Sequence, residues 1–294
     1  MVRRASHAGS WYRGTKKSLM EALDGYFTDD KFGPNEKFVL MNKDERTIIG
    51  GVSPHAGMDY SGPCAACTYL NLFKEKIPDT VIILGTDHIG YHKIALMSKG
   101  EWETPLGNLS IDEELTEKIL ENTNIIESDS SLFEGFPAEQ EHNIEIQLPF
   151  IKYCSQDEEV KIVPIKIAGT RDFKILDQIS KDITNAINSF DKDIIIVASS
   201  DMSHKQVDNS NQLNNFKEID LAVIEEFKKL NASKTLENAL KTTICGPQTI
   251  TTLMLIAQNL NATRGEKLKY YTSSEKTKSI GGYCVGYFSG ILIK

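Results

Sequence analysis

The chain has 294 residues, of which 41 are acidic and 33 basic, and its formal net charge is −8. An acidic chain without a long basic run is a poor candidate for non-specific binding to nucleic acid. Its apolar fraction of 40% and charged fraction of 25% are typical of globular proteins and exclude the disordered and fibrous classes. No break in composition divides the chain, so we predict a single domain over residues 1–294.

Neither a secretory signal nor a membrane span is expected. The first residues, MVRRASHAGSWY, are charged but lack an apolar stretch behind them. The longest apolar runs, such as the one from Ile194 to Ala198, are too short to cross a bilayer. Five scattered cysteines, an odd number, argue against a disulfide framework. We therefore expect a cytoplasmic protein that does not interact with membranes.

Short apolar runs alternate along the chain with segments of helical period, a pattern that predicts an α/β fold. Strands of this kind are typical of a sheet that helices cover on both faces. We expect one mixed central sheet with helices on each side. The predicted strands, in chain order, are Thr47–Ser53, Thr80–Leu84, Val160–Ile167, Ile194–Ser199 and Tyr283–Ile293.

Eight helices are predicted between these strands. Asp112 is the expected cap of the third, and Ser233 with Glu237 suits the start of the seventh. Pro247 fits the first turn of the eighth, where its missing N–H costs nothing. The segment Glu101–Asp112 has the composition of a turn-rich connection or hairpin. The helices are Lys16–Tyr26, Cys64–Phe73, Ile111–Asn122, Ile144–Tyr153, Phe173–Asn188, Phe216–Lys229, Ser233–Thr242 and Pro247–Asn259.

Three of the six histidines directly follow predicted strands. They are His55 in GGVSPHAG, His88 in ILGTDHIG and His204 in VASSDMSH. Ligands of open α/β sheets bind beyond the carboxyl ends of the strands, so these imidazoles are expected to share one crevice. Asp87 and Asp201 accompany two of them as ligands or supporting partners. The alternative for each histidine alone is a surface or hydrogen-bonding role.

Cys245 immediately precedes the predicted helix that Pro247 begins. The positive end of a helix dipole lowers the pKa of a thiol and favours the thiolate, which is the metal-binding form. We therefore add Cys245 to the candidate metal ligands. The alternative is a small buried thiol at a turn.

Two further motifs carry weaker signals. His142 begins a predicted helix with Glu141 and Glu145 beside it, which suits either a polar wall of the pocket or simply an acidic helix start. Cys64 and Cys67 form a C-x-x-C pair, but a closed zinc site needs four ligands. Their helical spacing favours packing in the core over a redox pair.

The chain resembles the MEMO family. The resemblance rests on six motifs in order, namely GVSPHAGMDYSG, ILGTDHIG, WETPLGNLSID, EHNIEIQLPF, SSDMSH and TTICGP, and on the opening HAGSWY. It implies a fold shared with the class III extradiol, or LigB-like, dioxygenases. Those enzymes hold non-haem ferrous iron with two histidines and a glutamate, and another histidine acts as acid and base.

Carried over residue by residue, the resemblance implies that His55 and His88 are metal ligands and that Cys245 stands in place of the glutamate. It also implies that His204 is the acid/base residue and that Asp201 lies in the pocket. His142, Glu141 and Asp87 are expected to line it. One departure is SSDMSHKQ, where family members often have an aromatic residue or glycine after the histidine.

The thiol makes the predicted site softer than that of the dioxygenases. Copper(I) or zinc is then favoured over iron, although the family is associated with both copper and iron. We expect a metal-dependent redox enzyme that acts on a small molecule. The alternatives are a non-catalytic metal-binding or peptide-binding protein with a vestigial pocket, and a zinc hydrolase. Neither the oligomeric state nor a protein partner follows from the sequence.

Overall fold

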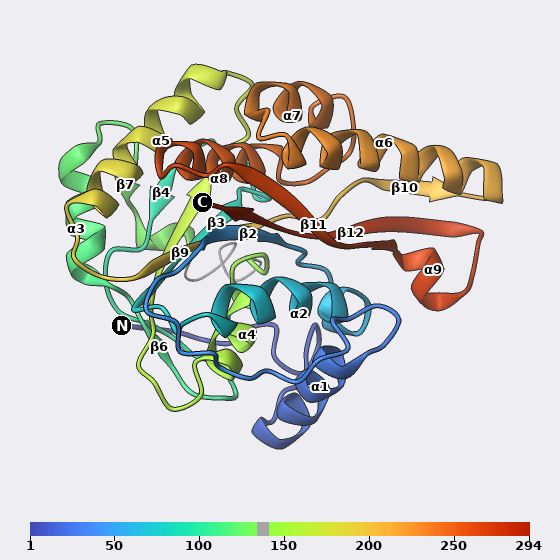
Figure 1. Cartoon of the computed structure of the whole chain (residues 1–294), viewed down its shortest axis with the longest axis horizontal. Helices are drawn as coiled ribbons and strands as arrows, with labels where there is room; N and C mark the ends of the chain where they lie inside the picture. Colours follow the sequence, from blue (N-terminus) through green and yellow to red (C-terminus); the bar gives the residue numbers. More distant parts are fainter. Residues whose placement is uncertain (134–140) are drawn as a thin grey trace.

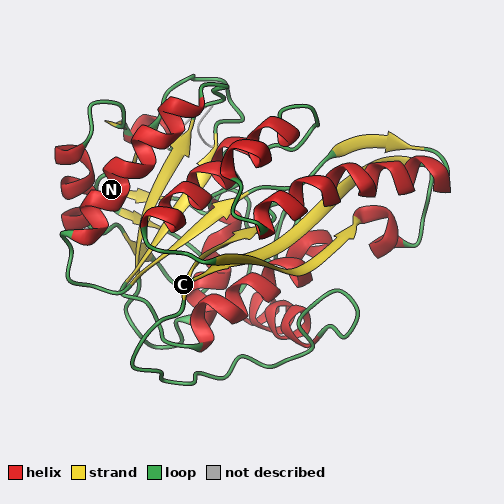
Figure 2. Ribbon diagram, turned by 45° about the horizontal axis from the view of Figure 1, so that its top comes forward, coloured by secondary structure: helices red, strands yellow, loops and turns green. Residues whose placement is uncertain are grey.

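The computed structural model describes residues 1–133 and 141–294. A central sheet with helices on both faces makes up most of the molecule (Figures 1 and 2). The strands of this sheet are β2 (Ile48–Ser53), β3 (Thr80–Thr86), β4 (Ala95–Leu96), β7 (Glu127–Ser128), β8 (Lys161–Ile167), β9 (Ile194–Ser199), β10 (His204–Val207), β11 (Arg264–Thr272) and β12 (Gly282–Ile293). A small second sheet contains β1 (Val2–Arg3), β5 (Glu101–Trp102) and β6 (Leu109–Ser110).

The helices of the described residues surround these strands. They are α1 (Lys16–Thr28), α2 (Met58–Lys74), α3 (Glu113–Asn122), α4 (Leu148–Cys154), α5 (Phe173–Asn188), α6 (Ser210–Lys228), α7 (Ala232–Ala239), α8 (Pro247–Asn259) and α9 (Ser273–Thr277), with 3₁₀ turns η1 (Ser130–Leu132) and η3 (Glu145–Gln147). None of them combines the length and the apolar character needed to cross a membrane.

The sheet is mixed, as the sequence predicts. Its order is β10-β12-β2-β9-β3-β8-β4-β7, and β11 pairs with β12 outside this order. The four strands β2, β9, β3 and β8 are parallel, whereas β12 runs antiparallel to β2. The carboxyl ends of the parallel strands therefore meet at one edge of the sheet.

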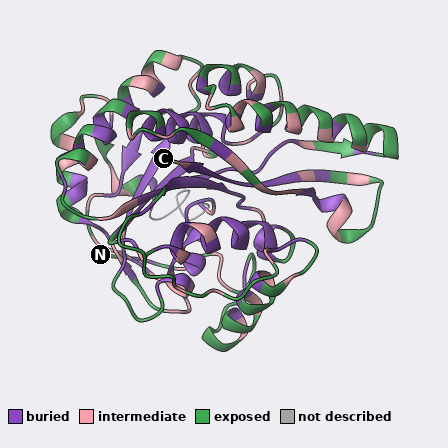
Figure 3. Cartoon of the chain, in the orientation of Figure 1, coloured by how far each residue is buried: buried purple, intermediate pink, exposed green. Residues whose placement is uncertain are grey.

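Two helical layers bury the two faces of this sheet. In Figure 1, α1, α2 and α4 lie on one side of it, and α5 and α8 lie on the other. Alternate residues of β3 point to opposite layers, so that Ile82 and Leu84 join one core, and Val81 and Ile83 join the other. Figure 3 shows the resulting buried centre and exposed outer helix faces. The apolar runs of the sequence are continuous because both faces are covered.

Most predicted elements are confirmed with small shifts at their ends. β9, α5 and α8 have the predicted bounds, and Asp112 caps α3 by accepting a hydrogen bond from Leu115 N at 3.1 Å. The predicted hairpin is present as the antiparallel pair β5 and β6. The predicted cap Ser233 is wrong, because Asn231 Oδ1 accepts the hydrogen bond from Lys234 N at the start of α7.

The structure differs from the predicted elements where polar residues obscure the apolar pattern of a helix or strand. α2 begins at Met58 rather than Cys64 and contains Pro63 within it. β10 and β11 were not expected, because both are rich in charged or amide side chains that face solvent. Cys64 and Cys67 are buried in α2, which confirms their packing role, and all five cysteines are free.

A buried ion pair fastens the start of the chain to the centre of the molecule. Arg3 in β1 pairs with Glu145 in η3, and both side chains are almost fully buried. Glu145 Oε1 also accepts hydrogen bonds from Tyr12 Oη at 2.9 Å and from His7 N at 2.8 Å. One carboxylate therefore holds three parts of the N-terminal segment beside η3, which directly follows the segment that carries His142.

Replacing Arg3 by methionine is expected to lower the free energy of unfolding by about 3–5 kcal/mol, because it leaves a buried carboxylate without its cation. Arg4→Met is the matched control, since Arg4 is exposed and pairs with Glu103 at 3.2 Å. That change is expected to cost less than about 1 kcal/mol. Urea unfolding measures both values. Equal decreases in the free energy of unfolding in the two variants would show that the buried pair contributes no more stability than the exposed one.

The carboxylate of Glu75, directly after α2, is the second carboxylate that several hydrogen bonds hold in place. Burial raises its pKa, but hydrogen bonds from Lys43 Nζ, Thr47 Oγ1, Thr47 N and Ile48 N outweigh burial and bring the pKa from 4.5 to about 2. A carboxyl with a depressed pKa stabilises the fold above its unfolded pKa, and this contribution is lost as the pH falls toward the folded value.

The free energy of unfolding of the wild type is therefore expected to fall between pH 4.5 and pH 2 partly through Glu75. Glu75→Gln should flatten this dependence, whereas Glu36→Gln, at an exposed position, should leave it unchanged. Denaturant titrations across this range test the idea. Parallel wild-type and Glu75→Gln curves would contradict it.

Candidate metal centre

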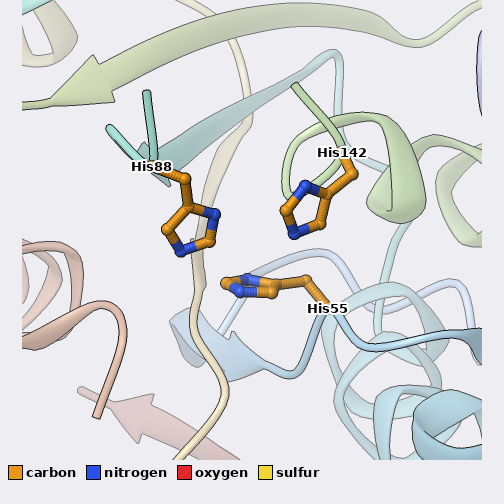
Figure 4. A group of neighbouring side chains, drawn as sticks. All are labelled: His55, His88 and His142. Atoms are coloured by element: carbon orange, nitrogen blue, oxygen red, sulfur yellow. The ribbon is translucent and has the colours of Figure 1, made fainter. Parts of the chain in front are cut away.

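The carboxyl ends of the parallel strands carry the candidate residues. His55 follows β2, His88 follows β3, and Asp201 follows β9, each by two residues. Since these strands are neighbours, the residues beyond their ends meet at one edge of the sheet. His142 reaches the same place from the segment just before η3 (Figure 4).

Three imidazoles form a compact group there, which we call the histidine cluster: His55, His88 and His142. One ring nitrogen from each lies within 4.8 Å of the other two. The ring centroids are 5.0 Å apart for His88 and His142, which stack, and 5.2 and 5.5 Å from His55 to each of them. Figure 4 shows the three rings facing one another. Imidazole nitrogens at this spacing are a suitable donor set for a transition metal.

Cys245 touches the histidine cluster through His55. Its Sγ lies 3.1 Å from His55 Nε2 and accepts a hydrogen bond from Asp201 N at 3.2 Å. The neighbouring Gly246 allows this approach, because its N–H donates to Ser200 Oγ at 3.0 Å and a Cβ there would lie 2.7 Å from the same oxygen. The turn before α8 therefore places the Cys245 sulfur in contact with the His55 imidazole.

The pKa of the Cys245 thiol shifts in the opposite direction from the sequence prediction. Burial and the adjacent Asp201 raise the pKa of the Cys245 thiol, so the expected thiolate is not the resting form without metal. Burial, with the other histidines, lowers the pKa of His55 and brings that of His88 to about 4. Both imidazoles are neutral at neutral pH, which is their ligating form.

Asp201 and His204 form a pair beside the histidine cluster. Asp201 Oδ1 accepts hydrogen bonds from His55 N at 2.8 Å and Ala56 N at 3.3 Å, and Oδ2 lies 3.8 Å from His204 Nε2. His204 Nδ1 lies 3.2 Å from Thr243 O. A carbonyl only accepts, so Nδ1 carries the proton and Nε2 faces the carboxylate. Burial raises the pKa of Asp201 to about 6.

The remaining predicted lining residues lie close by but have structural partners. Glu141 is buried, and its Oε1 accepts a hydrogen bond from Ile144 N at 2.8 Å; its Oε2 has no partner among the described residues. The Asp87 carboxylate accepts hydrogen bonds from Gly90 N at 3.0 Å and His92 N at 2.9 Å. It therefore shapes the loop after β3.

Sequence reasoning missed the aromatic neighbours of His142. The Trp11 ring centroid lies 4.4 Å from that of His142, and the His7 ring lies 5.9 Å from it. Sequence reasoning also placed His142 in the wall of the site, whereas its ring is a full member of the histidine cluster. The motif HAGSWY was the available signal for His7 and Trp11, but no strand was predicted before it to indicate where its side chains lie.

Comparison with known proteins agrees with the motifs. A family model described as Memo-like protein matches residues 3–291. The chain is 34% identical to a MEMO1 family protein of Pyrococcus furiosus over 100% of both chains, and 39% identical to one of Desulfurococcus amylolyticus over 95% of both. It is 34% identical to one of Nitrosopumilus maritimus, over 96% of this chain and 98% of the relative. From the family model and these full-length relatives, the chain belongs to the Memo-like family.

Proposed function

We propose that the protein binds a single redox-active metal ion, copper or iron, at the histidine cluster. The observation that carries this proposal is the convergence of three imidazole nitrogens within 4.8 Å, with the Cys245 sulfur 3.1 Å from one of them. His55, His88 and His142 would supply nitrogen ligands, and Cys245 would supply a sulfur ligand once its proton is displaced.

The chemistry of the donors supports this choice of metal. Imidazole suits copper, iron and zinc, and a thiolate shifts the preference toward copper(I) and zinc. Ferrous iron in oxygenases is typically held by two histidines and a carboxylate. Asp201, a candidate carboxylate at the site, already uses one oxygen to hold the backbone of residues 55 and 56. Copper is therefore the first metal to test, and zinc is the comparison.

A bound metal of this kind would supply electron transfer or Lewis acidity to a substrate. Asp201 and His204 would then hold or move a proton at His204 Nε2, which faces the carboxylate. His204 is suited to this role because its side chain is 23% exposed and can reach a substrate. If the kinship with extradiol dioxygenases that the motifs imply holds, the reaction would be an oxidation of a small aromatic substrate.

One observation favours a second candidate function, which is metal binding without catalysis. Catalytic metals keep an open position, whereas four protein donors close a tetrahedral site. Here three imidazole nitrogens lie within 4.8 Å of one another, and the Cys245 sulfur, 3.1 Å from His55 Nε2, would be the fourth donor. Under this alternative, the protein would store or transfer the metal, and the edge of the site would bind a partner molecule rather than turn one over.

The ligand assignment predicts the effects of single substitutions on metal binding. The wild type is expected to bind one copper(I) per chain, measured by competition with a chromophoric chelator. His55→Ala, His88→Ala and His142→Ala should each weaken binding by more than the roughly 10–100-fold that loss of a supporting residue costs. Cys245→Ser should weaken copper(I) more than iron(II), because it removes the soft donor.

His92→Asn is the matched control. His92 is exposed, lies outside the histidine cluster, and has a left-handed backbone that asparagine tolerates. Its affinity for copper(I) should equal that of the wild type. Unchanged binding in the three cluster variants, with their folds intact by circular dichroism, would overturn the proposed site.

Turnover distinguishes the two candidate functions. If the protein is an oxidoreductase, the copper-loaded or iron-loaded form should consume oxygen with one or more members of a catechol panel. His204→Ala should lower that rate by about 10²–10⁴-fold, the usual contribution of a positioned acid/base group, while metal content stays unchanged. Oxygen uptake that is equal in the wild type and His204→Ala would favour metal binding without catalysis.

A further inference from the structure

We propose that Ser199 is a positioning residue that holds His55 in the tautomer with its proton on Nδ1, so that Nε2 presents a lone pair to the histidine cluster. The inference rests on the proposed function for its importance, but it concerns the metal-free protein. It follows from counting donors and acceptors around one buried hydroxyl.

The side-chain amide of Gln147 has only one possible orientation. Gln147 Nε2 lies 3.0 Å from Pro54 O, and Gln147 Oε1 accepts a hydrogen bond from Tyr69 Oη at 2.9 Å. A backbone carbonyl only accepts hydrogen bonds, so the atom facing Pro54 O must be the amide nitrogen. The same nitrogen lies 2.9 Å from Ser199 Oγ and can therefore only donate to it.

The hydroxyl proton of Ser199 points to a backbone carbonyl. Ser199 Oγ lies 2.6 Å from Asn143 O, which again can only accept. The single hydroxyl proton is therefore directed to Asn143 O. The two lone pairs of Oγ remain, and Gln147 Nε2 donates to one of them.

His55 Nδ1 lies 2.9 Å from the same Oγ. Because the hydroxyl has no proton left, the short contact is a hydrogen bond only if Nδ1 donates. His55 is buried, and a neutral buried imidazole carries its single proton on one ring nitrogen. Nε2 then carries a lone pair, and it faces the Cys245 sulfur.

Asn143, whose backbone carbonyl accepts the Ser199 proton, is itself hydrogen-bonded to β3. Asn143 Nδ2 donates to Thr86 O at 2.8 Å, and Asn143 Oδ1 accepts from Thr86 N at 3.1 Å. This close contact requires Gly85, because a Cβ there would collide with Asn143 Oδ1. The network thus joins the strand ends that carry His55 and His88.

The test reads the tautomer directly. Protein labelled with ¹⁵N-histidine is prepared without metal at neutral pH, and long-range ¹H–¹⁵N correlation spectra identify the protonated ring nitrogen. Signals of His55 are assigned by their loss in His55→Asn. In the wild type, Nδ1 of His55 is expected to be protonated. In Ser199→Ala, which removes the acceptor, the ratio of Nδ1–H to Nε2–H forms should fall by roughly tenfold.

Two variants separate positioning from general damage to the fold. Ser199→Thr restores a hydroxyl and should restore the Nδ1–H form. Gln147→Met removes a buried neighbour of the same oxygen but leaves the acceptor of His55 in place, so the tautomer should stay unchanged. Copper(I) affinity should fall about 10–100-fold in Ser199→Ala and recover in Ser199→Thr.

An Nε2–H form in the wild type would overturn the inference, and so would an unchanged tautomer in Ser199→Ala. The wild-type tautomer requires only the His55→Asn assignment, so an Nε2–H form would overturn the inference even if Ser199→Ala is unstable. The expected tautomer together with no binding of copper, iron or zinc would instead reject the proposed function and leave the role of Ser199 intact.

Discussion

The parallel pairing of β2, β9 and β3 is the constraint on which the site depends. Parallel strands with matched register end at the same level, and so the residues just beyond them are brought together although they are far apart in sequence. Helices on both faces make this arrangement stable, because each strand buries apolar side chains on its two sides. The position of the candidate ligands beyond the strand ends therefore depends on the apolar packing on the two faces of the sheet.

Much of this arrangement was predictable from the sequence, for identifiable reasons. Strands buried on both faces appear as continuous apolar runs, and His55, His88 and Asp201 follow three of them directly. Their meeting could be inferred from the rule for parallel sheets alone. Cys245 could be found because Pro247 indicates the start of α8.

Other features depend on contacts that no local pattern encodes. His142 precedes a 3₁₀ turn, not a strand, so nothing in its own segment shows that its ring stacks on that of His88. The protonation of Cys245 was predicted wrongly because the helix dipole is a local property, whereas burial is a property of the whole fold. β11 was missed because its charged residues are tolerated at the outer side of the sheet, where β12 is its partner.

The contact between Gly85 and Asn143 has a consequence for how this site tolerates change over evolution. A side chain at position 85 would collide with the Asn143 side-chain amide, and the backbone carbonyl of the same residue accepts the Ser199 hydroxyl proton. Replacement of Gly85 by any larger residue would therefore alter the site indirectly, by displacing Asn143, which is not itself a proposed ligand. Substitutions at this position in related chains should accordingly be accompanied by compensating changes at the asparagine.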